Sequence, residues 1–183
     1  MSKTYICFLD INRFDGGDSI RGAALLTDQL TEPVEFRCTS EIRPTELQKT
    51  LWGGRLAGHI ATHLVGKPLV DALSVAPALI VVRKPEFVEI RTLIEVPLVQ
   101  LLQKGELSMA SSLAFPDGEG ESLESEGTDP LIMKSHRQFQ ADIETAHQLF
   151  DGTWRSVSLL EPFARIENSL AVVHHQDMRK AGS

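Results

Sequence analysis

Four side chains that carry oxygen ligands follow the first apolar segment of the chain, namely Asp10, Asn12, Asp15 and Asp18. Hard divalent cations such as Mg²⁺ bind clustered carboxylate and amide oxygens of this kind. An EF-hand calcium loop is excluded, because its fifth and sixth places would fall on Phe14 and Asp15. Two interpretations remain: a looser Mg²⁺ site formed by Asp10, Asp15 and Asp18, or a solvated turn between two strands. We favour the turn, since Asp and Gly are common in turns for local conformational reasons.

Two histidines, His59 and His63, form a second candidate site. They are four residues apart in a segment with helical periodicity, which places both rings on one face, where they can chelate zinc or nickel. Ile60 occupies the position at which the zinc-protease motif has a glutamate, so no general base accompanies the pair. We therefore expect exposed or hydrogen-bonded histidines rather than a metal centre.

Complete catalytic motifs of other kinds are absent from the sequence. It contains neither a GxxxxGKS/T nor a GxGxxG phosphate loop, and no GxSxG nucleophile elbow. The apolar run before Asp10 is too short for a secretory leader, and no apolar stretch approaches the ~20 residues that span a bilayer. We therefore expect a cytoplasmic protein that does not use a membrane, with Cys7 and Cys38 reduced and buried.

The net charge is unevenly distributed along the chain. The formal charge is −7, from 25 acidic and 18 basic residues, but six of the acids lie in residues 116–130, which contain no base. The remainder has 19 acids against 18 bases and is nearly neutral. Proteins that coat nucleic acid generally carry a basic surface, so overall acidity argues against such a role. Because that acidity belongs to one segment, nucleic acid stays among the partners that the sequence allows.

The first part of the chain has the pattern of strands that pair in sequence. Short apolar or alternating runs predict strands at residues 5–9, 20–27 and 33–39, with a loop at 12–19 between the first two. Tight connections between these runs favour an antiparallel three-stranded meander. The wholly apolar run at 78–82 is bounded by prolines and predicts a central strand of the sheet.

Helical periodicity separates the meander from the apolar strand. It begins near Pro44, is bent at Gly53-Gly54 and is expected to stop at Gly66-Lys67-Pro68, after which residues 69–73 predict another short helix. After the apolar strand, residues 87–91 predict a further strand, and residues 98–102 predict a strand or a helical turn. The fold class is therefore α/β or α+β.

Composition changes abruptly at residues 116–130. This segment holds six acids and three glycines but only one large apolar residue, so burial cannot repay its ordering entropy. We expect a flexible acidic linker or loop that separates a core of residues 1–115 from a helical C-terminal segment of residues 131–183. Amphipathic patterns in that segment predict two helices, which we expect to pack on the core.

The predicted order of three strands, a helix and an apolar strand resembles that of ribonuclease H-like folds. In those folds a carboxylate near the end of the first strand helps to hold a catalytic metal ion. The resemblance implies this role for Asp10, with Glu46 on the first helix as a second acid. The chain departs from the pattern after the apolar strand, where the fold has another carboxylate and this sequence has Arg83-Lys84-Pro85. A relative that has lost its catalytic acids would bind rather than cleave.

Two functions are consistent with these patterns. The main expectation is a non-catalytic binding or assembly subunit of a complex, with a protein partner or a second copy of the chain, because no catalytic motif is complete. The alternative is an Mg²⁺-dependent phosphodiesterase that acts on nucleic acid, with Asp10 as the chief ligand and Asp15, Asp18 or Glu46 assisting. Mg²⁺ is expected as a cofactor under the alternative only.

Overall fold

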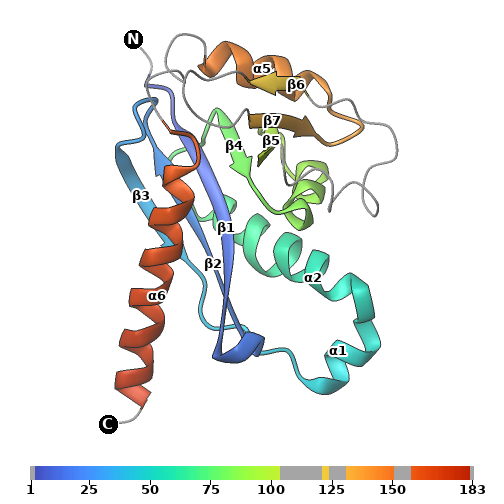
Figure 1. The fold of residues 1–183 in the computed structure, drawn as a ribbon, viewed down its shortest axis with the longest axis vertical. Helices are drawn as coiled ribbons and strands as arrows, with labels where there is room; N and C mark the ends of the chain where they lie inside the picture. Colours follow the sequence, from blue (N-terminus) through green and yellow to red (C-terminus); the bar gives the residue numbers. More distant parts are fainter. Residues whose placement is uncertain (1–2, 104–120, 124–130, 151–157, 182–183) are drawn as a thin grey trace.

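The computed structural model describes residues 3–103, 121–123, 131–150 and 158–181. Its strands are β1 (Ile6–Phe14), β2 (Ser19–Thr27), β3 (Pro33–Cys38), β4 (Leu79–Val82), β5 (Leu98–Gln103), β6 (Glu121–Leu123) and β7 (Leu131–Ser135). They form one mixed sheet in the order β3-β2-β1-β4-β5-β7-β6 (Figure 1). The strands β1, β2 and β3 make an antiparallel meander, whereas β1, β4 and β5 run parallel to one another.

Helices connect the strands and cover both faces of the sheet. A helical run joins β3 to β4 and comprises α1 (Glu46–Trp52), η2 (Gly53–Arg55), α2 (Leu56–His59), the π-type segment η3 (Ile60–Gly66) and α3 (Lys67–Asp71). A 3-10 helix, η4 (Pro85–Thr92), joins β4 to β5, and a short turn, η1 (Asp15–Gly17), joins β1 to β2. After β7 come α5 (Ala141–Phe150) and α6 (Glu161–Ala181).

The two faces of the sheet are covered by different parts of the chain. Successive side chains of a strand point to opposite faces. Phe8 of β1 therefore packs edge-on against Phe163 of α6, whereas Leu9 belongs to the core formed with Ile60 of η3. Figure 1 shows α6 along β1 and β2, and the run from α2 to α3 beside the sheet. The central strand β4 is buried on both faces, which explains its wholly apolar sequence.

Strand β1 is longer than its parallel neighbour β4. Their pairing ends with Leu9 opposite Val82, while β1 continues to Phe14. Asp10 is therefore the first residue of β1 beyond this pairing, at the carboxyl edge of the parallel strands. Open α/β sheets bind their ligands outside the carboxyl ends of such strands, so the fold places Asp10 where a site is expected.

The structure confirms the predicted α/β order, with its meander, its central apolar strand and its two late helices. Two boundaries are wrong. Residues 12–14 continue β1 instead of opening the loop. The helical run does not stop at Gly66-Lys67-Pro68, because Gly66 serves close packing instead: a Cβ there would lie 1.9 Å from Cδ1 of Ile90 in η4.

The strand predicted at residues 87–91 is also absent from the structure. These residues lie in η4, which starts at Pro85 and buries Phe87, Val88 and Ile90. Proline lacks the N–H that a sheet ladder needs and is well placed in the first turn of a helix. The buried positions do not alternate, so this segment packs onto the sheet rather than joining it.

The second half of the chain differs from the prediction in one strand pair. Most of the predicted linker at residues 116–130 lies outside the described residues, but Glu121–Leu123 within it forms β6 and pairs with β7, and neither strand was predicted. The expected packing of the late helices is observed, since Phe150 of α5 and Ile166 of α6 share a core with Phe8. The boundaries of the three parts stay a prediction.

Neither cysteine forms a disulfide. Cys7 is buried and Cys38 is half-buried. Burial raises the pKa of the Cys7 thiol far above its ordinary value, so this group is an inert core side chain. Among the helices in the described ranges, none combines the length and the apolar character that crossing a bilayer requires.

Candidate active site at the carboxyl edge of the parallel strands

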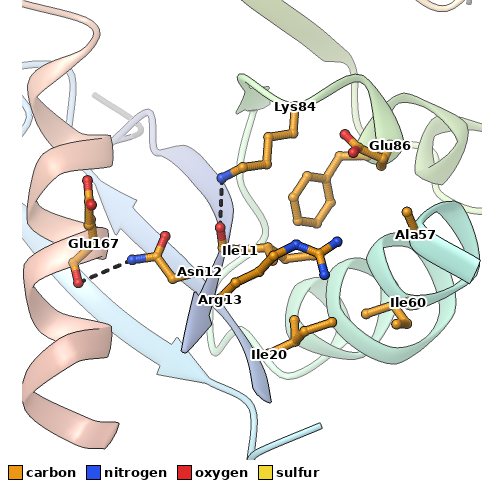
Figure 2. A pocket seen from close by; sticks show the side chains of 10 residues that line it. Ile11, Asn12, Arg13, Ile20, Ala57, Ile60, Lys84, Glu86 and Glu167 are labelled. Carbon is orange, nitrogen blue, oxygen red and sulfur yellow. Dashed lines mark hydrogen bonds between the residues drawn. The ribbon is translucent and has the colours of Figure 1, made fainter. Parts of the chain in front are cut away.

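Asp10 is paired with a lysine that arrives from the neighbouring strand. Only 7 % of Asp10 is exposed, and its Oδ1 accepts a hydrogen bond from the backbone N–H of Ile11 at 2.8 Å. The same oxygen forms an ion pair with the ammonium of Lys84, which also donates to the carbonyl oxygen of Ile11 at 2.7 Å (Figure 2). Lys84 follows β4 directly after Arg83, so the end of β4 delivers its ammonium to β1.

A cavity of about 350 Å³ opens at this ion pair, and we call it the Lys84 pocket. Part of its wall is apolar and is formed by side chains from β1, β2, α2, η3 and η4. Figure 2 shows the polar side chains around it, which come from β1, from the turn after β4 and from α6. The apolar lining residues are Ile11, Ile20, Ala57, Ile60 and Phe87, and the polar ones are Asn12, Arg13, Lys84, Glu86 and Glu167.

Arg13 and Glu86 are charged side chains of the Lys84 pocket that lack partners within the described part of the chain. Arg13 forms no hydrogen bond or ion pair there. The Oε2 atom of Glu86 is buried and has no hydrogen-bond partner. A buried carboxylate oxygen is costly unless a hydrogen-bond donor or a ligand contacts it. An exposed cation and an unsatisfied acid therefore line the same cavity.

Asn12 connects the pocket to the opposite face of the sheet. Its amide donates to the main-chain carbonyl of Glu167 in α6 at 3.5 Å (Figure 2). The side chain of Glu167 lines the pocket as well. The C-terminal helix thus completes a wall that begins in the first strand.

The structure places Glu46 and Asp18 elsewhere. Glu46 lies in the first turn of α1, its side chain is 87 % exposed, and it pairs with Lys49 at 2.7 Å. Asp18 pairs with the same lysine at 3.1 Å. Neither residue lines the Lys84 pocket. The assignment of Asp10 and Glu46 as catalytic partners stays a prediction, and the geometry brings Lys84 to Asp10 instead.

Asp15 belongs to a separate polar group at the far end of β1. Among the residues that the structure describes, one set of three could offer clustered metal ligands, and it consists of Asp15, Glu41 and His174, whose ligand atoms lie within 4.8 Å of one another. The guanidinium of Arg43 pairs with both acids. Hydrogen bonds from Arg43 and Ser19 lower the pKa of the Glu41 carboxyl to about 2. An arginine thus already supplies the positive charge at this group.

The two histidines lie side by side as their spacing predicts. The ring centroids of His59 and His63 are 5.2 Å apart, and Trp52 stacks on His59 at 4.1 Å. No described acid, cysteine or further histidine joins the pair to make a cluster of three. His63 is exposed and His59 is half-buried. The expectation of exposed or hydrogen-bonded histidines, and the alternative of a metal site at the pair, both stay predictions.

The ribonuclease H-like order implies a divalent metal ion at Asp10, and the donors present there do not fit one. The ammonium of Lys84 pairs with Oδ1 of Asp10 and donates to the carbonyl oxygen of Ile11, so a cation already lies at this carboxylate. The carboxylates of Glu86 and Glu167 do not form a ligand cluster with Asp10 in the described ranges. Catalytic metal sites of nucleases need several carboxylates on one ion, so we derive no chemical step through a metal at this position.

Sequence reasoning missed Lys84, Arg13 and Glu86 as residues of the candidate site. The sequence showed Lys84 only as a departure from the ribonuclease H-like pattern, and Arg13 only as part of the loop predicted at residues 12–19. The available signal was position: Lys84 and Glu86 follow the apolar strand directly, at the edge where this class of sheet binds ligands.

Comparisons with known proteins identify the fold. No protein-family model and no curated protein matches the chain, but solved structures match over nearly its whole length. The match to endonuclease V of Bacillus subtilis has a TM-score of 0.61 at 14 % identity and covers 98 % of this chain and 84 % of that one. The Streptomyces avermitilis enzyme gives 0.57 at 15 %, covering 99 % and 84 %. The chain shares the endonuclease V fold. Endonuclease V of Ciona intestinalis, solved in complex with DNA that contains an inosine, gives 0.53 at 11 %, covering 92 % and 87 %.

These matches overturn the main functional expectation. The chain was expected to be a non-catalytic binding or assembly subunit, but the solved structures that share its fold are endonucleases. They favour the alternative, in which the protein acts on nucleic acid. The expectation of a protein partner or a second copy of the chain stays a prediction.

Proposed function

We propose that this protein is a phosphodiesterase that acts on nucleic acid and binds the phosphate backbone at the Lys84 pocket. The observation that carries the proposal is the position of the pocket, at the carboxyl edge of β1 and β4 in the endonuclease V fold. The Ciona intestinalis structure of that fold contains bound DNA, which supports nucleic acid as the ligand.

The composition of the pocket suits a phosphodiester. Lys84 and Arg13 supply two positive charges for non-bridging phosphate oxygens. Charged donors fixed in a partly enclosed site stabilise the negative charge that develops during phosphoryl transfer. The apolar wall provides a surface for the neighbouring sugar or base, in a cavity whose size is within the usual range for small ligand sites.

Glu86 is the residue that we assign as the general base. In hydrolysis, water forms a bond to phosphorus while the bond to the leaving oxygen breaks, and a general base accepts a proton of the water. Asp10 is committed to Lys84, whereas the buried Oε2 of Glu86 has no hydrogen-bond partner. The proton that the leaving oxygen takes up comes from solvent in this scheme.

The test is a cleavage assay with labelled single-stranded and double-stranded DNA and RNA, each with Mg²⁺, with Mn²⁺ and with EDTA. The wild-type protein is expected to cleave at least one of these substrates. Glu86→Gln should lower the rate by about 10²-fold or more, as expected for loss of a general base. Glu95→Gln, which changes an exposed glutamate on the loop before β5, is the matched control and should cleave like the wild type.

Two results would contradict the proposal. Absence of cleavage by the wild type under every condition removes the phosphodiesterase function. Equal rates for Glu86→Gln and the wild type remove Glu86 from the reaction and require another base.

A further inference from the structure

We infer that Lys84 takes the place of the divalent metal ion that the fold implies at Asp10, and that its ammonium contacts the bound phosphate directly. The second half of this inference rests on the proposed function, because it assumes that the Lys84 pocket binds nucleic acid. The first half concerns only the occupancy of the Asp10 carboxylate and can be tested with a metal ion alone.

The contacts of Lys84 carry the inference. Its ammonium meets two oxygens at the carboxyl edge of the sheet, Oδ1 of Asp10 and the carbonyl oxygen of Ile11. Carboxylate and carbonyl oxygens are also the ligands of hard cations. An ammonium has three N–H donors, so two are used on β1 and one remains for a group in the pocket that Lys84 lines. A phosphate oxygen is an acceptor suited to it.

A divalent ion at Asp10 would have to displace this arrangement. Oδ1 already accepts from the backbone N–H of Ile11 at 2.8 Å as well as from Lys84. The metal would lie beside the ammonium, where like charges repel strongly in a partly buried site. Within the described ranges, Asp10 belongs to no group of three acid, histidine or cysteine ligands that would offset this repulsion.

The inference gives Asp10 a different role from the one that the fold implies. Asp10 is a positioning residue, which holds the ammonium at the mouth of the pocket while Lys84 contacts the phosphate. The side chain of Asp10 is 10 % exposed and that of Lys84 is 43 % exposed. The buried carboxylate can therefore hold the ammonium in place, while the more exposed lysine is accessible to a ligand. Loss of Asp10 should therefore affect metal binding little and phosphate binding less than loss of Lys84.

The first experiment measures Mn²⁺ binding to the protein alone by electron paramagnetic resonance. Wild type and Asp10→Asn should bind Mn²⁺ equally, because the ion does not use Asp10. Lys84→Glu replaces the ammonium by a second carboxylate and should gain one Mn²⁺ site, which the double variant Asp10→Asn with Lys84→Glu should lose again. A wild-type site that Asp10→Asn abolishes would overturn the inference, as would the absence of a gained site in folded Lys84→Glu.

The second experiment measures the affinity for a fluorescent single-stranded oligonucleotide by anisotropy. Wild-type affinity should be the same in EDTA and in Mg²⁺. Lys84→Met should weaken binding at least 10-fold, Lys84→Arg should restore part of it, and Asp10→Asn should lose less than Lys84→Met. Lys67→Met is the matched control, since Lys67 also pairs with an aspartate but lies on α3 outside the pocket.

The outcomes separate the inference from the proposed function. Binding that EDTA abolishes, or equal binding by Lys84→Met and the wild type, would overturn the role of Lys84 while leaving nucleic acid as the ligand. If the wild type binds no nucleic acid, the proposed function and the phosphate contact both fail. The Mn²⁺ measurement then still decides whether Lys84 occupies the metal position.

Discussion

The charged side chains that the described chain buries have partners of opposite charge: Asp10 pairs with Lys84, Asp142 with Arg91 and Arg21 with Asp177. Glu86 differs, because its buried Oε2 has no hydrogen-bond partner. A protein retains such a group at a cost in stability, and unsatisfied groups in a cavity are characteristic of functional sites. At the scale of single residues, Glu86 is therefore the strongest indication of chemistry in the pocket.

The same cost makes a prediction about stability. Glu86→Gln removes a carboxyl group whose buried Oε2 has no hydrogen-bond partner, and it should leave the free energy of unfolding unchanged or raise it by up to about 1 kcal/mol, although it lowers activity. Urea unfolding measures this difference, with Glu95→Gln expected to remain within about 0.5 kcal/mol of the wild type. A loss above 2 kcal/mol in Glu86→Gln would show that the carboxylate has a structural partner.

The carboxyl of Glu41 gives a prediction about pH. Hydrogen bonds from Arg43 and Ser19 lower its pKa from 4.5 to about 2 in the folded protein. Because the folded pKa is depressed, the stabilisation is fully present above about pH 4.5 and is lost as the pH falls towards 2. Arg43→Met should return the pKa towards 4.5, as measured by NMR titration of the Glu41 side chain. An unchanged pKa in the variant would assign the shift to Ser19.

At the scale of elements, the helical run between β3 and β4 shows how packing overrides local signals. The sequence Gly66-Lys67-Pro68 is typical of a helix end, yet the run continues to Asp71. Gly66 lies against η4, where its missing side chain lets the π-type segment approach Ile90. The close approach is a property of two elements that are distant in sequence, and it helps to hold η4, which carries Glu86, against the sheet.

This contact predicts opposite effects for two glycines of the same helical run. Gly66→Ala places a Cβ 1.9 Å from Cδ1 of Ile90 and 2.8 Å from the carbonyl oxygen of Ala61. Overpacking of this kind should lower the free energy of unfolding by about 1–3 kcal/mol. Gly58→Ala meets no atom within 4 Å and should raise it by about 0.5–1 kcal/mol, because alanine favours helix. Urea denaturation compares the two, and equal effects would contradict the close packing.

At the scale of the whole molecule, an ion pair at the start of β5 joins two helices that pack on opposite faces of the sheet. Asp142 of α5 accepts from Arg91 of η4 at 2.6 Å and from the backbone N–H of Leu98 in β5 at 3.0 Å. Both charged side chains are buried, at 12 % and 6 % exposure. The pair thereby connects the face that carries α5 and α6 with the opposite face, where η4 borders the Lys84 pocket.

Removing one partner of this pair should leave an uncompensated buried charge. We expect Asp142→Ala to lower the free energy of unfolding by about 3–5 kcal/mol. Asp71→Ala is the matched control, because it removes an exposed aspartate from a surface pair with Lys67 and should cost less than about 1 kcal/mol. Thermal and urea unfolding measure both variants. A small effect of Asp142→Ala would mean that the two layers are held by apolar packing alone.

The sequence by itself determined the elements whose signal is local. Alternation and apolar runs located β2, β3 and β4, helical periodicity located α5 and α6, and the order of elements indicated a ribonuclease H-like arrangement with Asp10 at its edge. These predictions succeeded because the period of side chains along a strand or helix follows from backbone geometry.

Only the tertiary structure decided what surrounds Asp10. Lys84 is 74 residues away from Asp10 in the chain. It reaches Asp10 because β4 pairs in parallel with β1, and the last residue of β4, Val82, lies opposite Leu9, the residue before Asp10. The environment of Glu86, whose Oε2 has no hydrogen-bond partner, and the ion pair between Arg91 and Asp142 likewise depend on which elements pack together. Such contacts arise from the long-range packing of the chain, which no local period encodes, so the character of the site became visible only in the fold.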